Sequence, residues 1–145
     1  MPLAVLLVRL LLGLLLIGAG ALKVAHPADL ASAIAGFRLL PPEVVAPMAV
    51  ILPYFEMLLG LYLTLGLFTR LAGIVAAAQF VLYAGAIASA VLRGIPANCG
   101  CFGPGDVAVA DWPHVAFDLA LAAVAAFIAV GAPGTLALDR RLRSR

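Results

Sequence analysis

The stretch LAVLLVRLLLGLLLIGAGAL, residues 3–22, holds one charged residue, Arg9, in twenty positions. A helix rises about 1.5 Å per residue, so a segment of this length covers the hydrocarbon core of a bilayer, about 30 Å thick. A helix also satisfies its backbone polar groups internally, as that core requires. The stretch therefore predicts a membrane-spanning helix. It has no basic n-region, so we expect it to remain in the protein and not to be cleaved as a signal peptide.

The composition of the whole chain agrees with this interpretation. Of its 145 residues, 66% are hydrophobic and 11% are charged, and the mean hydropathy is +1.19. A soluble domain is about half apolar and about a quarter charged. Three more apolar stretches, residues 44–67, 71–92 and 112–130, are long enough to span. We expect an all-α membrane protein: one domain, residues 1–145, forming a bundle of four transmembrane helices in a lipid bilayer.

A short helix is predicted between the first two spans. Leu30, Ile34 and Phe37 fall on one helical face. Pro27 can open such a helix, and Pro41-Pro42 must end it. We expect this helix to lie in the membrane interface.

The arginine and lysine counts predict the orientation of the spans. Arg70 and the four arginines of the C-terminal tail fall on one side, and Lys23, Arg38 and Arg93 fall on the other. The positive-inside rule then places both termini in the cytoplasm and the loop after the third span in the periplasm or cell exterior. The net charge is only +2, and basic residues are not interleaved with aromatic ones, which argues against nucleic-acid binding.

The loop NCGCFGPGD, residues 98–106, contains both cysteines of the chain. A disulfide between Cys99 and Cys101 closes almost no loop, so it adds little stability by constraining the unfolded chain. Its ring would be strained, although Gly100 relieves crowding, and strained disulfides tend to be labile or catalytic. An oxidising compartment lets such a pair exist as a disulfide. The loop favours thiol redox chemistry; a structural disulfide or inert thiols are the alternatives.

Metal binding by the same loop is a further alternative. Cys99 and Cys101 supply half of a tetrahedral zinc site, and His26 and His114, on the same predicted side, would complete a Cys₂His₂ set. A Cu(I) site needs fewer ligands. The spacing of the histidines, however, matches no zinc motif.

Four ionisable residues lie within or at the ends of the spans. Charges inside a membrane are costly, so they pair with one another or face a polar cavity. Arg9 can either snorkel to the cytoplasmic interface or pair inside the bundle. Glu56 lies near the middle of its span and is expected to face the bundle interior, with a polar partner from the first or third span. Lys23 and Asp118 lie at depths that let them meet. Structural ion pairing and proton handling both remain open roles for these residues.

Three stretches together carry a resemblance to a known family. CGCFG follows the third of four spans, LPYFEMLLGLYLTLG forms part of the second, and RLLLGLLLIGAGALKVAHP covers most of the first. Over nearly its whole length the chain resembles the MauE branch of the DoxX-like integral membrane proteins. CGCFG is the most specific of these stretches.

The resemblance implies a multi-pass protein of the bacterial cytoplasmic (inner) membrane. It implies that Cys99 and Cys101 are a redox pair, with Gly100, Phe102 and Gly103 completing the motif. Arg9, Lys23 and Glu56 match charged positions of the family. MauE proteins are methylamine-utilisation accessory proteins associated with making or protecting disulfides in a secreted client enzyme. DoxX relatives are linked to quinone-coupled sulfur oxidation.

These considerations predict a membrane thiol–disulfide redox protein. Because the chain has one cysteine pair, cysteines alone cannot relay electrons across the membrane. The pair can exchange with a periplasmic thioredoxin-like protein or client, or pass electrons to a lipid quinone near the outer end of the bundle. The alternatives are a copper or zinc transporter or metal-delivery protein, and a structural subunit of a membrane redox complex.

Overall fold

The computed structural model describes residues 2–100, 108–132 and 134–139. Within these ranges the chain forms five helices, α1 (Pro2–Val24), α2 (Pro27–Gly36), α3 (Pro42–Leu65), α4 (Thr69–Leu92) and α5 (Trp112–Gly131). By length and composition, all of them except the ten-residue α2 can cross a membrane. The predicted all-α class, the four spans and the short helix between the first two are confirmed. The second span ends two residues earlier than expected, because Gly66 caps α3 in the left-handed conformation.

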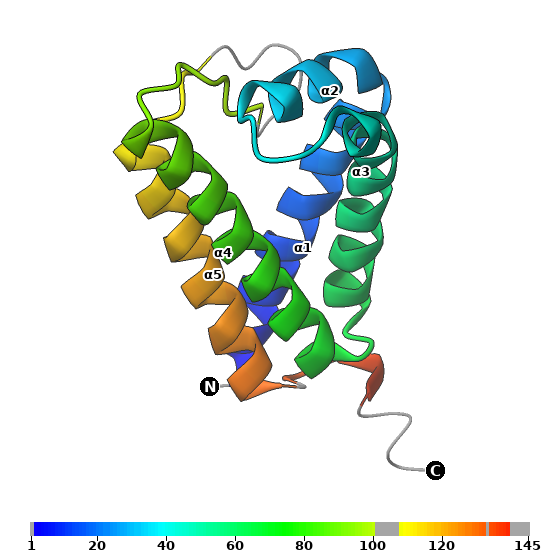
Figure 1. Cartoon of the computed structure of the whole chain (residues 1–145). Helices are drawn as coiled ribbons and strands as arrows, with labels where there is room; N and C mark the ends of the chain where they lie inside the picture. Colours follow the sequence, from blue (N-terminus) through cyan, green and yellow to red (C-terminus); the bar gives the residue numbers. More distant parts are fainter. Residues whose placement is uncertain (1, 101–107, 133, 140–145) are drawn as a thin grey trace.

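The four long helices form two pairs. α1 packs along α3 and α4 packs along α5, whereas the consecutive helices α3 and α4 have much less contact. Figure 1 shows the two pairs close together at one end of the bundle and diverging toward the end that carries α2. The bundle is therefore closed at one end and widened at the other.

Two glycines bring α1 and α3 into direct backbone contact. A Cβ atom on Gly60 of α3 would lie 2.5 Å from the carbonyl oxygen of Gly13 in α1, and a Cβ atom on Gly13 would lie 2.8 Å from that of Gly60. Neither position has room for a side chain. Small residues at such crossings let membrane helices approach closely enough to gain van der Waals contact.

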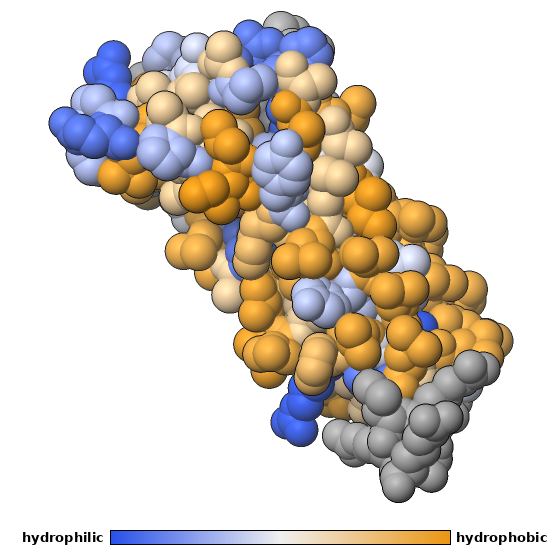
Figure 2. All heavy atoms as spheres, turned by 90° about the vertical axis from the view of Figure 1, so that its right-hand side faces the viewer, coloured by the Kyte–Doolittle hydropathy of each residue, from blue (hydrophilic) through white to orange (hydrophobic). Residues whose placement is uncertain are grey.

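The surface and the core of the bundle are both apolar. Figure 2 shows apolar side chains over the body of one face, with hydrophilic residues mainly toward its ends. Inside, all four long helices contribute to one central cluster of buried residues: Leu12, Leu16, Leu59, Leu63, Ala72, Ala76, Phe80, Ala122, Ala125 and Ile128. An apolar exterior of this kind is suited to contact with lipid.

Arg9 lies inside the closed end of the bundle. Its side chain is 1% exposed and lies directly under Gly66, where a Cβ atom would be 2.2 Å from a guanidinium nitrogen. The carboxylate of Asp139 acts on it electrostatically, and also accepts hydrogen bonds from the backbone N–H groups of Phe68 (2.7 Å) and Thr69 (2.8 Å) at the start of α4. Arg9 is therefore buried, with its guanidinium reaching the turn at Gly66 at the closed end of the bundle.

Both ends of the described chain lie at this closed end. α1 begins there, and residues 134–139 lie there too, opposite α2 and the segment that follows α4 (Figure 1). This is the arrangement that four spans require. Which end faces the cytoplasm, and whether α2 lies in the interface, stay predictions.

The glycine crossing predicts a position-dependent effect of alanine. Gly60→Ala places a methyl group against a backbone oxygen, and overpacking of this kind costs about 1–3 kcal/mol. The matched control is Gly85→Ala on α4, where nothing lies within 4 Å and the higher helix propensity of alanine favours the folded state by about 1 kcal/mol. Thermal unfolding in detergent, followed by circular dichroism, should show a lower midpoint for Gly60→Ala only. Equal midpoints for the two variants would contradict close packing at this crossing.

Candidate functional site

A short antiparallel pairing holds the described part of the cysteine loop in place. The backbone N–H of Cys99 donates to the carbonyl oxygen of Ala108 (2.9 Å), and that of Ala110 donates to Ala97 (2.8 Å). Asn98 and Val109 form an isolated antiparallel bridge between these bonds. Cys99 is thereby fixed at the wide end of the bundle.

Cys99 is half-buried and packs against an apolar cluster at that end. Cys99 is disulfide-bonded and so is not a free thiol. Its neighbours include the buried residues Ala84, Ile87, Ala90, Ala97, Ala110 and Val115. The other predicted residues of this motif, Cys101, Phe102 and Gly103, lie outside the described residues.

The short helix α2 covers the cysteine loop. Gly100 has φ +63°, and a Cβ atom there would lie 3.0 Å from the Cβ of Ala33 in α2. Gly100 thus allows both the left-handed backbone and the close approach of the helix. Arg93, just after α4, donates to the carbonyl oxygens of Phe37 and Arg38, which ties the end of α4 to the end of α2.

A buried polar cluster, formed by Lys23, Glu56, Gln79 and Tyr83, joins three helices. Lys23 Nζ of α1 donates to both carboxylate oxygens of Glu56 in α3, at 3.1 and 2.9 Å. The two residues are 5% and 1% exposed. Gln79 Nε2 of α4 donates to Glu56 Oε1 (3.1 Å) and to the hydroxyl oxygen of Tyr83 (3.0 Å), and that hydroxyl donates to Glu56. The expectation that Glu56 faces the interior with partners from the first or third span is confirmed.

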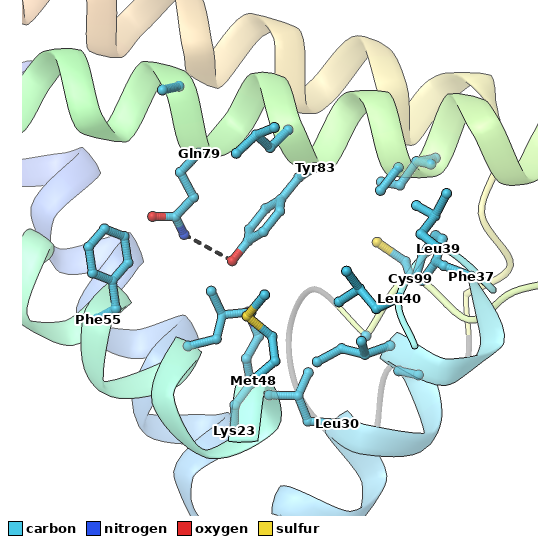
Figure 3. Close-up of a pocket in the computed structure, with 18 of the residues that line it drawn as sticks. Lys23, Leu30, Phe37, Leu39, Leu40, Met48, Phe55, Gln79, Tyr83 and Cys99 are labelled. Atoms are coloured by element: carbon cyan, nitrogen blue, oxygen red, sulfur yellow. Dashed lines mark hydrogen bonds between the residues drawn. The ribbon is translucent and has the colours of Figure 1, made fainter. Parts of the chain in front are cut away.

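A cavity of about 510 Å³ lies between α2, α3, α4 and the cysteine loop. Its polar lining consists of Lys23, Gln79 and Tyr83, and Cys99 and Gly100 also line it. The other lining residues are apolar: Leu30, Ala33, Ile34 and Phe37 of α2, Leu39 and Leu40 after it, Met48, Leu52 and Phe55 of α3, and Val75, Ala78, Leu82, Ala86 and Ile87 of α4. Figure 3 shows Cys99 toward one end and Phe55 at the other, with Gln79 and Tyr83 projecting between them. One cavity therefore connects the described cysteine with the polar cluster.

Asp118 is buried in α5. It does not form the ion pair with Lys23 that the similar depth of the two residues in their spans suggested. It is 4% exposed, and among the described residues its Oδ2 atom has no hydrogen-bond partner. Lys23, which we placed within its reach, forms its ion pair with Glu56 instead. The ammonium of Lys23 and the side chain of His114 still act on the Asp118 carboxyl electrostatically.

The two histidines lie beside carboxylates at the wide end. His114 Nδ1 lies 2.5 Å from Asp111 Oδ1, and this side-chain hydrogen bond is the main cause that lowers the pKa of Asp111 below its usual range. His26 Nδ1 lies 3.8 Å from Asp29 Oδ2. Within the described residues no group of three or more His, Cys, Asp or Glu side chains could hold a metal ion. The Cys₂His₂ alternative gains no support from these residues; its fourth member, Cys101, lies outside them.

Sequence reasoning missed Gln79 and Tyr83. The available signal was a polar amide in the middle of the third span, with a tyrosine one helical turn later on the same face. A polar side chain at that depth needs a partner for the same reason that Glu56 does. The third span was expected to offer a partner to Glu56, and Gln79 and Tyr83 are the residues of that span that do so.

The ion pair predicts strongly non-additive mutations. Glu56→Leu leaves the Lys23 ammonium buried without its partner, and breaking one side of a buried pair costs about 3–5 kcal/mol. Glu56→Gln keeps hydrogen-bonding capacity and should cost less. The double variant Lys23→Met/Glu56→Leu removes both charges and should regain most of the lost stability. Unfolding midpoints in a double-mutant cycle measure this coupling. If the loss of stability in the double variant equals the sum of the losses in Lys23→Met and Glu56→Leu, the pair does not act as a unit.

Comparison with known proteins places these features in a family. The family model of methylamine utilisation protein MauE matches residues 1–131. A MauE of Paracoccus denitrificans is 32% identical over 136 residues, which cover 93% of this chain and 73% of the relative. A MauE of Methylophilus methylotrophus is 33% identical over 130 residues, covering 88% and 68% of the two chains.

A third relative, a MauE of Methylorubrum extorquens, is 34% identical over 125 residues, covering 86% of this chain and 67% of the relative. No solved structure matches this chain significantly. The resemblance noted from the sequence is confirmed by a family match that extends over all four predicted spans and the cysteine loop. This multi-pass membrane protein belongs to the MauE family.

Proposed function

We propose that this chain is a thiol–disulfide oxidoreductase of the bacterial cytoplasmic membrane, and that its Cys99–Cys101 pair supports disulfide formation in a secreted client. One observation carries the proposal: Cys99 is disulfide-bonded and lines a cavity, between helices long and apolar enough to span a membrane, that is also lined by members of the buried polar cluster. A cysteine that only stabilised the loop would not need to line a cavity shared with a buried polar cluster. The relatives are named methylamine utilisation proteins, and the proposal places this chain in the same process.

The chemistry of the pair is a two-electron exchange with a dithiol protein. A thiolate of the client, or of a thioredoxin-like protein that serves it, attacks one sulfur of the pair and forms a mixed disulfide. The second thiol of that protein then attacks the mixed disulfide. The client leaves with a new S–S bond, having lost two electrons and two protons, and the pair is left as two thiols. A separate acceptor must then reoxidise the pair.

The cysteine loop is well placed for such a partner. It lies at the opposite end of the bundle from the start of α1 and residues 134–139, and the arginine counts assign that opposite end to the cytoplasm (Figure 1). The loop then faces the periplasm, where disulfides persist. The pairing of residues 97–99 with 108–110 holds Cys99 at this end of the bundle.

Trapping tests the exchange reaction. Cys101→Ala or Cys99→Ala removes the thiol that resolves the mixed disulfide, so one of these variants should accumulate a disulfide-linked protein that mass spectrometry can identify. The double variant Cys99→Ala/Cys101→Ala is the control and should trap nothing. In a glutathione buffer series, the metal-free pair should have a reduction potential above roughly −300 mV, the bound for typical structural disulfides.

Two results would contradict the exchange reaction. One is the absence of any mixed disulfide from both single variants, together with a potential well below that bound. The other is stoichiometric copper or zinc binding by the reduced pair, which would assign the loop to metal delivery.

Labelling tests the orientation. After mild reduction, a membrane-impermeant maleimide should label Cys99 and Cys101 from outside intact spheroplasts. The control is Arg70→Cys in a chain that lacks both native cysteines, because Arg70 is exposed at the closed end, and it should be labelled only after permeabilisation. The reverse pattern would place the cysteine loop in the cytoplasm and remove the oxidising compartment from the proposal.

A further inference from the structure

We infer that the cavity between α2, α3 and α4 binds a lipid quinone, with Gln79 and Lys23 at its ring oxygens, and that this quinone reoxidises the Cys99–Cys101 pair. The inference rests on the proposed function, because the pair must be redox-active for the quinone to accept its electrons. It names the acceptor that reoxidises the cysteine pair and two residues that bind this acceptor.

The cavity is open toward lipid. Leu82 of α4 and Phe55 of α3 line it and are 72% and 41% exposed, so the lining between these two helices is not closed off by other side chains. They stand on the two helices that diverge toward this end (Figure 1). An opening between apolar helices inside the membrane admits a molecule dissolved in the bilayer and offers no path for a charged, water-soluble one.

The polar cluster has hydrogen-bonding capacity that faces a ligand. Gln79 is 6% exposed, and its Oε1 atom has no hydrogen-bond partner within the described structure, while its two N–H donors serve Glu56 and Tyr83. An ammonium has three donors, and the two oxygens of Glu56 take two of those of Lys23. A buried acceptor left unpaired is costly, so a ligand with a matching donor is favoured.

These two groups fit both redox forms of a quinone. The third N–H of Lys23 can donate to a quinone carbonyl, and Gln79 Oε1 can accept from a quinol hydroxyl. A fatty acid would bring its carboxylate toward Glu56 and be repelled. A phospholipid head group needs several donors for its phosphate, and the one cation in the cavity lining that the structure describes is already paired with Glu56. The apolar lining suits the ring and the first part of an isoprenoid tail.

The reaction balances without another reactant. The two S–H bonds of the reduced pair break and the S–S bond forms, which releases two electrons and two protons. The quinone takes up both, and its two carbonyl groups become hydroxyl groups. Cys99 lines the same cavity as Gln79 and Lys23, so a quinone in the cavity occupies the space that the sulfur faces. The quinol then leaves between α3 and α4 into the bilayer.

A matched pair of tryptophan substitutions tests the site. Ala78→Trp fills the cavity from an exposed position on α4, and Ala126→Trp adds the same side chain at an exposed position on α5 that does not line the cavity. Each variant is reconstituted in phosphatidylcholine vesicles with decylubiquinone and dithiothreitol, and quinone reduction is followed by absorbance. Ala78→Trp should slow protein-dependent reduction at least about tenfold, while Ala126→Trp should match the wild type.

Two further measurements separate this inference from the proposed function. The equilibrium of the cysteine pair in glutathione buffer should be unchanged in both tryptophan variants. Decylubiquinone retained by immobilised protein should reach about one per chain. Gln79→Leu should lower the retention of the reduced form, decylubiquinol, about tenfold, the change that about 1.4 kcal/mol produces, because only the quinol has a hydroxyl that can donate to Gln79 Oε1.

The outcomes are distinguishable. A pair that equilibrates with glutathione, in a wild-type protein that neither retains nor reduces the quinone, overturns the inference and leaves the proposed function standing. Equal quinone reduction by Ala78→Trp and the wild type overturns the assignment of the cavity. Retention of phospholipid in place of quinone does the same. An inert pair in a protein that retains quinone, and that retains quinol through Gln79, overturns the proposed function and the electron transfer, and supports the binding site.

Discussion

The buried ion pair between Lys23 and Glu56 is the interaction on which the rest of the bundle depends. Lipid is as apolar as the helix surfaces, so burial of apolar side chains does little to bring helices together in a membrane. A charge inside the bundle, by contrast, must find its partner. The pair joins α1 to α3, and the hydrogen bonds from Gln79 and Tyr83 add α4. It thus links the pair α1 and α3 to the pair α4 and α5.

The cavity follows from unequal packing along the bundle. The glycine crossing of α1 and α3, and the burial of Arg9 at the closed end, hold the helices tightly in one half of the membrane. Among the described residues, α3 and α4 have much less contact with each other than α3 has with α1 or α4 has with α5, and the cavity between them is also lined by residues of α2 and by Cys99 and Gly100. The arrangement that buries the charges of Lys23 and Glu56 therefore also leaves room for a ligand beside them.

The position of Cys99 connects the aqueous and lipid sides of the proposed chemistry. In the proposed reaction, a secreted client approaches from the loop side and a lipid quinone arrives between the helices. Cys99 lies where these routes meet, because the short antiparallel pairing fixes it over the wide end and Gly100 lets α2 pack against it. With one cysteine pair, a disulfide system must bring both partners to the same sulfur atoms, and this placement meets that requirement.

The sequence by itself determined the four spans, the short helix α2 and the inward position of Glu56. Each of these follows from a local property: the length of an apolar stretch, the prolines that begin and end a helix, and the cost of a carboxylate in the middle of the membrane. The tertiary structure alone decided that Lys23 pairs with Glu56 and not with Asp118, that Arg9 stays inside, and that Gln79, Tyr83 and Cys99 line one cavity. Those outcomes depend on how each helix is rotated and tilted against its neighbours. Rotation and tilt are set by contacts between residues far apart in the chain, such as Gly13 with Gly60, and no local pattern encodes them.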